Sequence, residues 1–131
     1  MFTNTIGKNV TKSGNETVVF EFFAEEVPDF VLPHVKVGAM LFDNDTNLEL
    51  GEVTDIEIAP AKIYEANDAG MTVLSEKEDY SSIRITGKVK GTIGDFGVEI
   101  GGVKYGVGHS MTLRTGTAKI YLKISDIREA L

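Results

Sequence analysis

Residues 35–58 read VKVGAMLFDNDTNLELGEVTDIEI, and this pattern predicts a strand, a turn and a second strand. A fainter copy of the same plan occupies residues 105–127, as YGVGHSMTLRTGTAKIYLKISDI. Each copy begins with a Val-Gly pair, and the two glycines, Gly38 and Gly108, are 70 positions apart. Matched glycines are typical of turns that need a positive φ or a close backbone approach. The pattern therefore predicts that the chain contains the same structural unit twice.

The two copies also change their buried face at the same point. Asp55 and Asp126 lie 71 positions apart, and at each of them the apolar alternation slips by one residue. Such a slip reverses which face is buried, so we expect a bulge or bend in both copies. An alternating segment precedes each copy, VVFEFF in the first and SIRITGKV in the second. We predict an all-β fold, a duplicated, pseudo-symmetric barrel or sandwich whose halves pair their edges.

Period-two alternation identifies the residues of the expected core. A strand with one buried face places alternate side chains inward. The inward set, by this pattern, is Val18, Phe20, Phe22, Ile83, Ile85, Val89, Ile120, Leu122 and Ile124. The best helical candidate is VPDFVLPHV at residues 27–35, which Pro33 limits to one or two turns.

The length of 131 residues fits one domain. We expect a single β domain at residues 16–131, built from related halves at about 16–64 and 80–131. Residues 1–15 are polar and contain glycine, which predicts a flexible leader or linker. The sequence has no cysteine, which excludes disulfides, thiolate metal sites and cysteine nucleophiles. No run reaches the roughly 18 apolar residues that a membrane-spanning helix needs, so we expect this chain to be soluble.

Charge is distributed unevenly along the chain. Residues 1–79 hold 16 acidic and 5 basic residues, a net of −11, whereas residues 80–131 hold 4 acidic and 8 basic residues, a net of +4. This asymmetry indicates either an anionic partner for the basic half or two halves that dock and partly neutralise each other. We favour the second interpretation, since charged faces are common on solvated sheets.

Four segments resemble a known family: HVKVGAMLFD, LGEVTDIEIAPA, GVEIGGVKYGVGHSMTLRTG and ISDI. Over residues 18–127 the chain is similar to a bacterial domain-of-unknown-function family with the catalogue number forty-three thirty. The resemblance implies a β-rich domain that usually follows one N-terminal membrane helix. It also implies an extracytoplasmic, membrane-tethered location in the full-length protein, with membrane contact only through an anchor that this chain lacks. It supplies no activity and no catalytic residues.

The DNDTNLE segment is a weak candidate for a calcium loop. Asp43, Asp45, Asn47 and Glu49 alternate as oxygen ligands do at the start of such a loop. Leu48, however, occupies the sixth position, which requires glycine. Asp and Asn also favour turns through local hydrogen bonds, so a hairpin tip explains the segment without a metal.

No other motif predicts catalysis or a cofactor. The two histidines, His34 and His109, occupy different places in the repeat and would need carboxylates to complete a zinc site. GGVKYGVG lacks the dinucleotide-binding spacing, and no helical stretch follows it. The acidic pairs are typical of solvated surface. We therefore expect no catalytic residue, no metal and no cofactor.

The basic strand face is the remaining binding candidate. If its two strands pair, five cations form one stripe crossed by Tyr121, and this stripe can meet an anionic partner. The acidic half argues against nucleic acid. The five cations are Arg84, Lys88, Lys90, Lys119 and Lys123.

Three hypotheses for the function follow. The first is a non-enzymatic interaction module that binds a protein or polymer of the cell envelope. The second is a small-ligand-binding β-barrel with its pocket between the halves. The third, a hydrolase that uses scattered carboxylates, has the weakest support, since no nucleophile is paired with a base.

Overall fold

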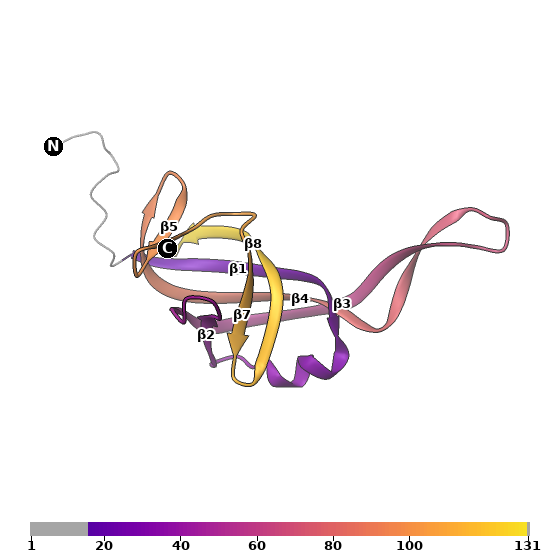
Figure 1. Cartoon of the computed structure of the whole chain (residues 1–131), viewed down its shortest axis with the longest axis horizontal. Helices are drawn as coiled ribbons and strands as arrows, with labels where there is room; N and C mark the ends of the chain where they lie inside the picture. The colour runs from indigo at the N-terminus through magenta and orange to yellow at the C-terminus, as the bar shows by residue number, and fades with distance from the viewer. Residues whose placement is uncertain (1–15, 131) are drawn as a thin grey trace.

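The structure, a computed structural model, describes residues 16–130, so the predicted leader at 1–15 lies outside the described residues (Figure 1). The described part contains eight strands and one short 3-10 helix. In chain order these are β1 (Glu16–Pro28), η2 (Asp29–His34), β2 (Met40–Asp43), β3 (Glu49–Ala66), β4 (Thr72–Gly94), β5 (Gly97–Ile100), β6 (Val103–Tyr105), β7 (Ser110–Thr115) and β8 (Ala118–Glu129). The prediction of an all-β fold with one or two helical turns is confirmed.

A closed ring of strands forms the body of the molecule. The sheet order is β1-β8-β7-β2-β3-β4-β5-β6, and β1 also pairs with β4. This extra pairing joins six strands into a barrel, so the fold is a barrel rather than a sandwich. β5 and β6 continue from the end of β4 as a side hairpin.

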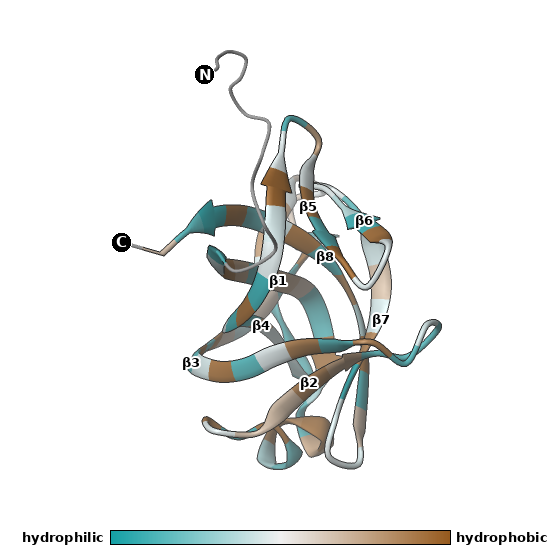
Figure 2. Ribbon diagram, turned by 90° about the vertical axis from the view of Figure 1, so that its left-hand side faces the viewer, coloured by the Kyte–Doolittle hydropathy of each residue, from teal (hydrophilic) through white to brown (hydrophobic). Residues whose placement is uncertain are grey.

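The barrel interior is a packed hydrophobic core. Hydrophilic and hydrophobic residues alternate along the barrel strands, as the teal and brown bands show (Figure 2). Phe20 and Phe22 are fully buried and stack with their ring centroids 5.2 Å apart. Of the predicted inward set, eight residues are buried, and Val89 packs against the core while partly exposed. Alternation therefore predicted the buried face correctly.

The two halves repeat the same hydrogen bonds. The amide of Gly38 donates to the carbonyl of Val53, and the amide of Gly108 donates to that of Ile124, both at 2.8 Å. The two glycines have φ values of +92° and +94°, a region that L side chains rarely adopt. The glycine pair that the sequence analysis matched therefore closes equivalent turns.

The predicted bulges are also present, one in each half. The register shifts between Val53 and Asp55 where β3 meets β4, and it shifts between Glu21 and Phe22 where β1 meets β8. The extra residue carries a hydroxyl in both cases. Thr54 donates to the carbonyl of Thr86 at 3.2 Å, and Ser125 donates to that of Glu21 at 3.1 Å. These bonds hold each bulge to the neighbouring strand.

One feature was not predicted: β3 and β4 extend far beyond the barrel as a two-stranded arm (Figure 1). The arm, residues 61–80, starts after the Pro60–Ser81 pair and reverses at the turn 67–70. The sequence-based prediction ended the first half at about residue 64, began the second at about residue 80, and named no strand between them. Between the Pro60–Ser81 and Lys62–Glu76 pairs, β4 has four residues where β3 has one. Asp79 lies in this bulge with φ +64°, and the irregularity redirects the arm away from the barrel.

Candidate functional site

The predicted basic stripe is not continuous. β4 and β8 do not pair with each other, because both pair with β1, which lies between them. Phe23 therefore separates Arg84 from Lys123 in one row of the barrel wall. In the next row, Glu21 lies between Thr86 and Asp126. The condition for the stripe, pairing of the two strands, is not met.

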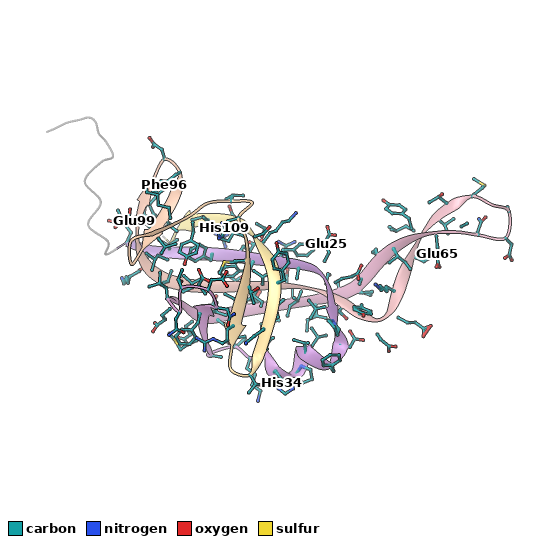
Figure 3. All side chains as sticks on the ribbon, in the orientation of Figure 1. Glu25, His34, Glu65, Phe96, Glu99 and His109 are labelled. Atoms are coloured by element: carbon teal, nitrogen blue, oxygen red, sulfur yellow. The ribbon has the colours of Figure 1, made fainter. Side chains whose placement is uncertain are left out.

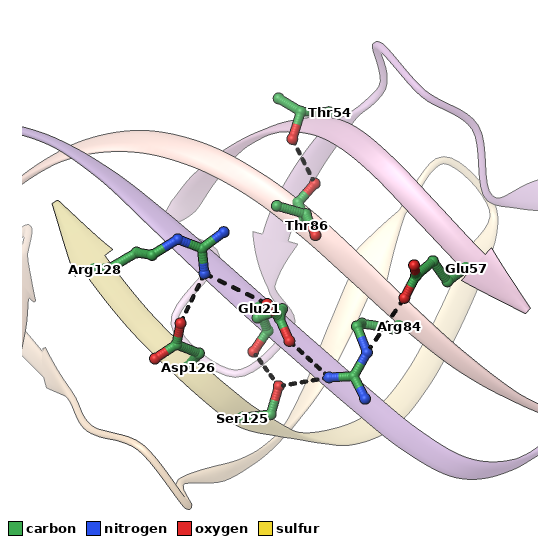
Figure 4. Close-up of polar contacts among 8 residues, drawn as sticks. All are labelled: Glu21, Thr54, Glu57, Arg84, Thr86, Ser125, Asp126 and Arg128. Carbon is green, nitrogen blue, oxygen red and sulfur yellow. Dashed lines mark hydrogen bonds and ion pairs between the residues drawn. The ribbon is translucent and has the colours of Figure 1, made fainter. Parts of the chain in front are cut away.

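Arg84 is engaged in a network of ion pairs on the barrel wall (Figure 4). Its guanidinium lies 2.6 Å from Glu21 and 3.5 Å from Glu57. Arg128 lies 3.4 Å from Glu21 and 2.7 Å from Asp126. The hydrogen bond to Asp126 is the main cause that raises the pKa of Arg128 above its ordinary value. The charges of Arg84 and Arg128 are therefore paired with carboxylates of the same chain, so they are less available to an anionic partner.

The other predicted cations lie on two separate parts of the wall. Lys88 is in register with Val19 on one side and Glu52 on the other, and Lys90 donates to the hydroxyl of Thr17 at 2.9 Å. In the pairing of β7 with β8, Lys119 is in register with Arg114, and Lys123 is in register with Ser110. The exposed ring of Tyr121 lies between Lys119 and Lys123 on β8. The predicted cations outside the Arg84 network therefore form two groups, one on β4 and one on the β7–β8 hairpin.

The candidate calcium loop forms a tight turn. The amide of Asn47 donates to the carbonyl of Asp43 at 2.7 Å, and the amide of Asp45 donates to the Asp43 carboxylate at 2.9 Å. The Asn47 side chain accepts a hydrogen bond from Arg114. Among residues 16–130, no three His, Cys, Asp or Glu side chains are grouped as metal ligands would be. Asp43, Asp45 and Glu49 therefore do not converge on one point.

Asp43 has a buried role that the sequence analysis missed. Its carboxylate accepts a hydrogen bond from the hydroxyl of Tyr105 at 2.7 Å, and both residues are buried. Burial and this hydrogen bond raise the pKa of Tyr105 to about 12. Burial acts to raise the pKa of Asp43 as well, but the bonds from Tyr105, Asp45 and Thr46 outweigh it, and the pKa is lowered. The contact ties β6 to the end of β2.

The two histidines do not share a site. His34 ends η2 and contacts the hydroxyl of Thr117 at 3.3 Å, whereas His109 packs edge-on against the ring of Tyr105. Figure 3 shows the two residues well apart on the barrel.

Four of the exposed large apolar side chains in the described part of the chain lie on the arm: Tyr64, Met71, Val73 and Leu74. Tyr64 and Leu74 are cross-strand partners, and they are 76% and 56% exposed. Met71, near the arm's tip, is 65% exposed. An isolated two-stranded hairpin is marginally stable in water, so a projecting hairpin with exposed apolar side chains is unusual without a binding role.

A groove runs between the arm and the barrel wall. It encloses about 370 Å³ and is lined by Phe23, Glu25, Pro60, Lys62, Tyr64, Leu74 and Ser82. A smaller hollow of about 190 Å³ adjoins it, with Phe23 and Glu25 common to both. That hollow extends to Tyr121 and Lys123 on β8. Three aromatic residues, Tyr64, Phe23 and Tyr121, therefore line one continuous surface. We call the larger hollow the arm groove.

The arm itself is acidic. Residues 61–80 contain five acidic and two basic residues, a net of −3. Both lysines are already paired, Lys62 with Glu76 at 3.6 Å and Lys77 with Glu26 at 2.6 Å. Four carboxylates remain without a cation among the residues that the structure describes: Glu65, Asp68, Glu78 and Asp79. Figure 3 places Glu65 along the arm and Glu25 on the wall beside its base.

Comparison with known proteins gives a family but no activity. No helix within residues 16–130 is long and apolar enough to cross a membrane. No curated protein and no solved structure matches the chain. A family model described as Domain of unknown function (DUF4330) matches residues 2–128, which is nearly the whole sequence. The match covers both halves of the barrel and the arm between them. The chain belongs to the DUF4330 family.

Proposed function

We propose that this domain is a non-enzymatic interaction module that binds a protein partner of the bacterial cell envelope in the arm groove. The observation that carries the proposal is the exposed Tyr64–Leu74 pair, which faces a groove that also contains Phe23. Contiguous aromatic and apolar side chains that remain exposed are typical of binding surfaces. A protein is favoured over a sugar polymer, because the exposed Tyr64, Met71 and Leu74 can be buried against apolar side chains of a protein.

The proposal also places the domain outside the cytoplasm, on a membrane tether. The support for this location is the resemblance to family members that carry an N-terminal membrane helix. A fusion of the full-length gene to an enzyme active only outside the cytoplasm tests it. Activity of the fusion supports the location, and an inactive but stable fusion contradicts it.

Photo-crosslinking in cells tests the binding site. A photo-reactive residue replaces Thr72, which lies on the same face of the arm as Leu74. We expect a crosslink to one defined protein, and we expect Leu74→Arg to abolish it. The matched control is Val107→Arg, because Val107 is similarly exposed, at 64%, but lies outside the arm groove. The isolated partner should bind purified wild-type protein at least about tenfold more tightly than the Leu74→Arg variant.

Two results would overturn the proposal. One is a partner that binds equally to the wild type, to Leu74→Arg and to Val107→Arg, with all three proteins folded by circular dichroism. The other is a crosslink to an envelope polymer rather than a protein.

A further inference from the structure

Neither outer edge of the arm pairs with a further strand among residues 16–130, and the edge of β4 is the one that continues from the pairing with β1. β1 pairs with β4 until its last residue, Pro28, which is in register with Tyr80, and the chain then turns into η2. Beyond that point β4 is paired only with β3. Within the described part of the chain, residues 72–76 of β4 therefore have unpaired amide and carbonyl groups along their outer edge. Such an edge is a template for an added strand.

The end of β1 is fixed beside this edge. Lys77 lies 2.6 Å from Glu26 of β1, and its ammonium group lies 4.3 Å from the centre of the Tyr80 ring. These contacts close the junction between β1 and β4, so the vacant edge starts at Glu76. An added strand on this edge would continue the line of β1 and would run antiparallel to β4. Val73, 36% exposed, and Leu74 are available on opposite faces to pack against its side chains.

Charge selects the occupant of this edge. The arm has a net charge of −3, so the arm of a second copy would bring like charges together. A cationic segment, in contrast, would meet four carboxylates that have no cation within the described residues. Charge complementarity of this kind favours the partner during encounter and fixes its position.

We propose that an extended segment of the partner, rich in lysine or arginine and alternating with apolar residues, adds to residues 72–76 as a third, antiparallel strand. This inference rests on the proposed function and states how the partner binds. The backbone of the partner supplies affinity through the edge, and its apolar side chains enter the arm groove beside Leu74. Its basic side chains meet the carboxylates of the arm.

A synthetic peptide in which lysine alternates with valine tests the inference on the full chain. We expect binding that weakens as salt rises, because the charged groups are exposed. We expect amide exchange to slow at alternate residues between 72 and 76. Two further peptides carry N-methyl groups on alternate residues. The first peptide has them on the odd positions and the second on the even positions, so each blocks one edge of the extended peptide. Only one of them should lose binding, by at least about tenfold, because an antiparallel strand uses one edge for pairing.

The outcomes separate this inference from the proposed function. Absence of binding, equal binding of both methylated peptides, or equal binding of a peptide with glutamate in place of lysine would overturn strand addition by a cationic segment. Concentration-dependent dimerisation with protection of the same amides would assign the edge to a second copy instead. If the crosslinked partner depends on Leu74 but leaves the exchange of residues 72–76 unchanged, the proposed function stands and this inference fails. If the peptide adds to the edge but the cellular partner binds Leu74→Arg as well as the wild type, the edge accepts a cationic strand, and the partner site in the proposed function fails.

Discussion

Removal of the Tyr105 hydroxyl should destabilise the fold in a pH-dependent way. The Tyr105→Phe variant keeps the ring that packs edge-on against Phe20 and His109. It deletes only the donor that lies 2.7 Å from the Asp43 carboxylate. A hydrogen bond to a charged group contributes about 1.5–3 kcal/mol, so we expect the free energy of unfolding to fall by about 2 kcal/mol near neutral pH. The expected decrease in melting temperature is about 8 °C.

The direction of the pH dependence follows from the two pKa shifts. The lowered pKa of Asp43 contributes stability above the unfolded pKa of that group and loses it as pH falls through the folded pKa. The cost of Tyr105→Phe should therefore be full at neutral pH and shrink below about pH 4. Tyr105 itself has a pKa raised to about 12, so its contribution should be lost as pH rises from about 10 towards that value. The Tyr105→Phe variant should not show this loss of stability at alkaline pH, because it has no hydroxyl at position 105 to titrate.

Urea unfolding followed by circular dichroism at several pH values measures both effects. The control is Tyr121→Phe, because Tyr121 is 70% exposed and its change should stay within about 0.5 kcal/mol. A Tyr105→Phe variant as stable as the wild type would refute the reasoning. So would a loss of equal size at acidic and neutral pH, since the carboxylate would then have no part in it.

Three further predictions concern the barrel. Gly51→Ala should prevent stable folding, because the backbone has φ +100° and a Cβ there would lie 1.9 Å from the carbonyl oxygen of Lys88. Gly102→Ala is the control: its φ is +83° and the space around it is open, so it should cost only about 1–2 kcal/mol of stability. Equal melting temperatures for the two variants would contradict this prediction. Ile85→Ala should cost about 2–5 kcal/mol in urea unfolding, since Ile85 is fully buried, whereas Lys88→Ala on the same strand should cost less than about 0.5 kcal/mol. Calcium at millimolar concentration should leave the melting temperature unchanged, and a rise that chelator reverses would restore the calcium interpretation of the Asp43 turn.

The sequence predicted which face of each strand is buried better than it predicted which strands pair. Alternation identified Ile85 and Leu122 as buried because it depends only on the period of the side chains. It contains no information on which strands pair, so the insertion of β1 between β4 and β8 was missed, and with it the break in the basic stripe. The matched glycines succeeded because a positive φ limits the residue types that fit.

The arm and the Tyr105–Asp43 contact were missed for different reasons. On the arm, Tyr64 and Leu74 are exposed although they are apolar. The arm strands therefore have no buried face that would produce an alternation of apolar and polar residues. Pro60 gave a partial signal, since proline within a sheet favours an edge strand. The Tyr105–Asp43 bond joins residues 62 positions apart, and no local pattern marks such a pair. Both features depend on tertiary structure.

Closure of the barrel through β1 has a consequence for the order of folding. β1 is synthesised before the other described strands, but one of its two neighbours, β8, is the last of them. The bond from Ser125 to Glu21 spans 104 positions, so this side of the barrel can form only after nearly all of the described chain has been made. Contacts of such long range slow folding because a large loop must close first. Until then β1 has an open edge of apolar and aromatic residues, and a chaperone that covers this edge during synthesis would protect the protein from aggregation.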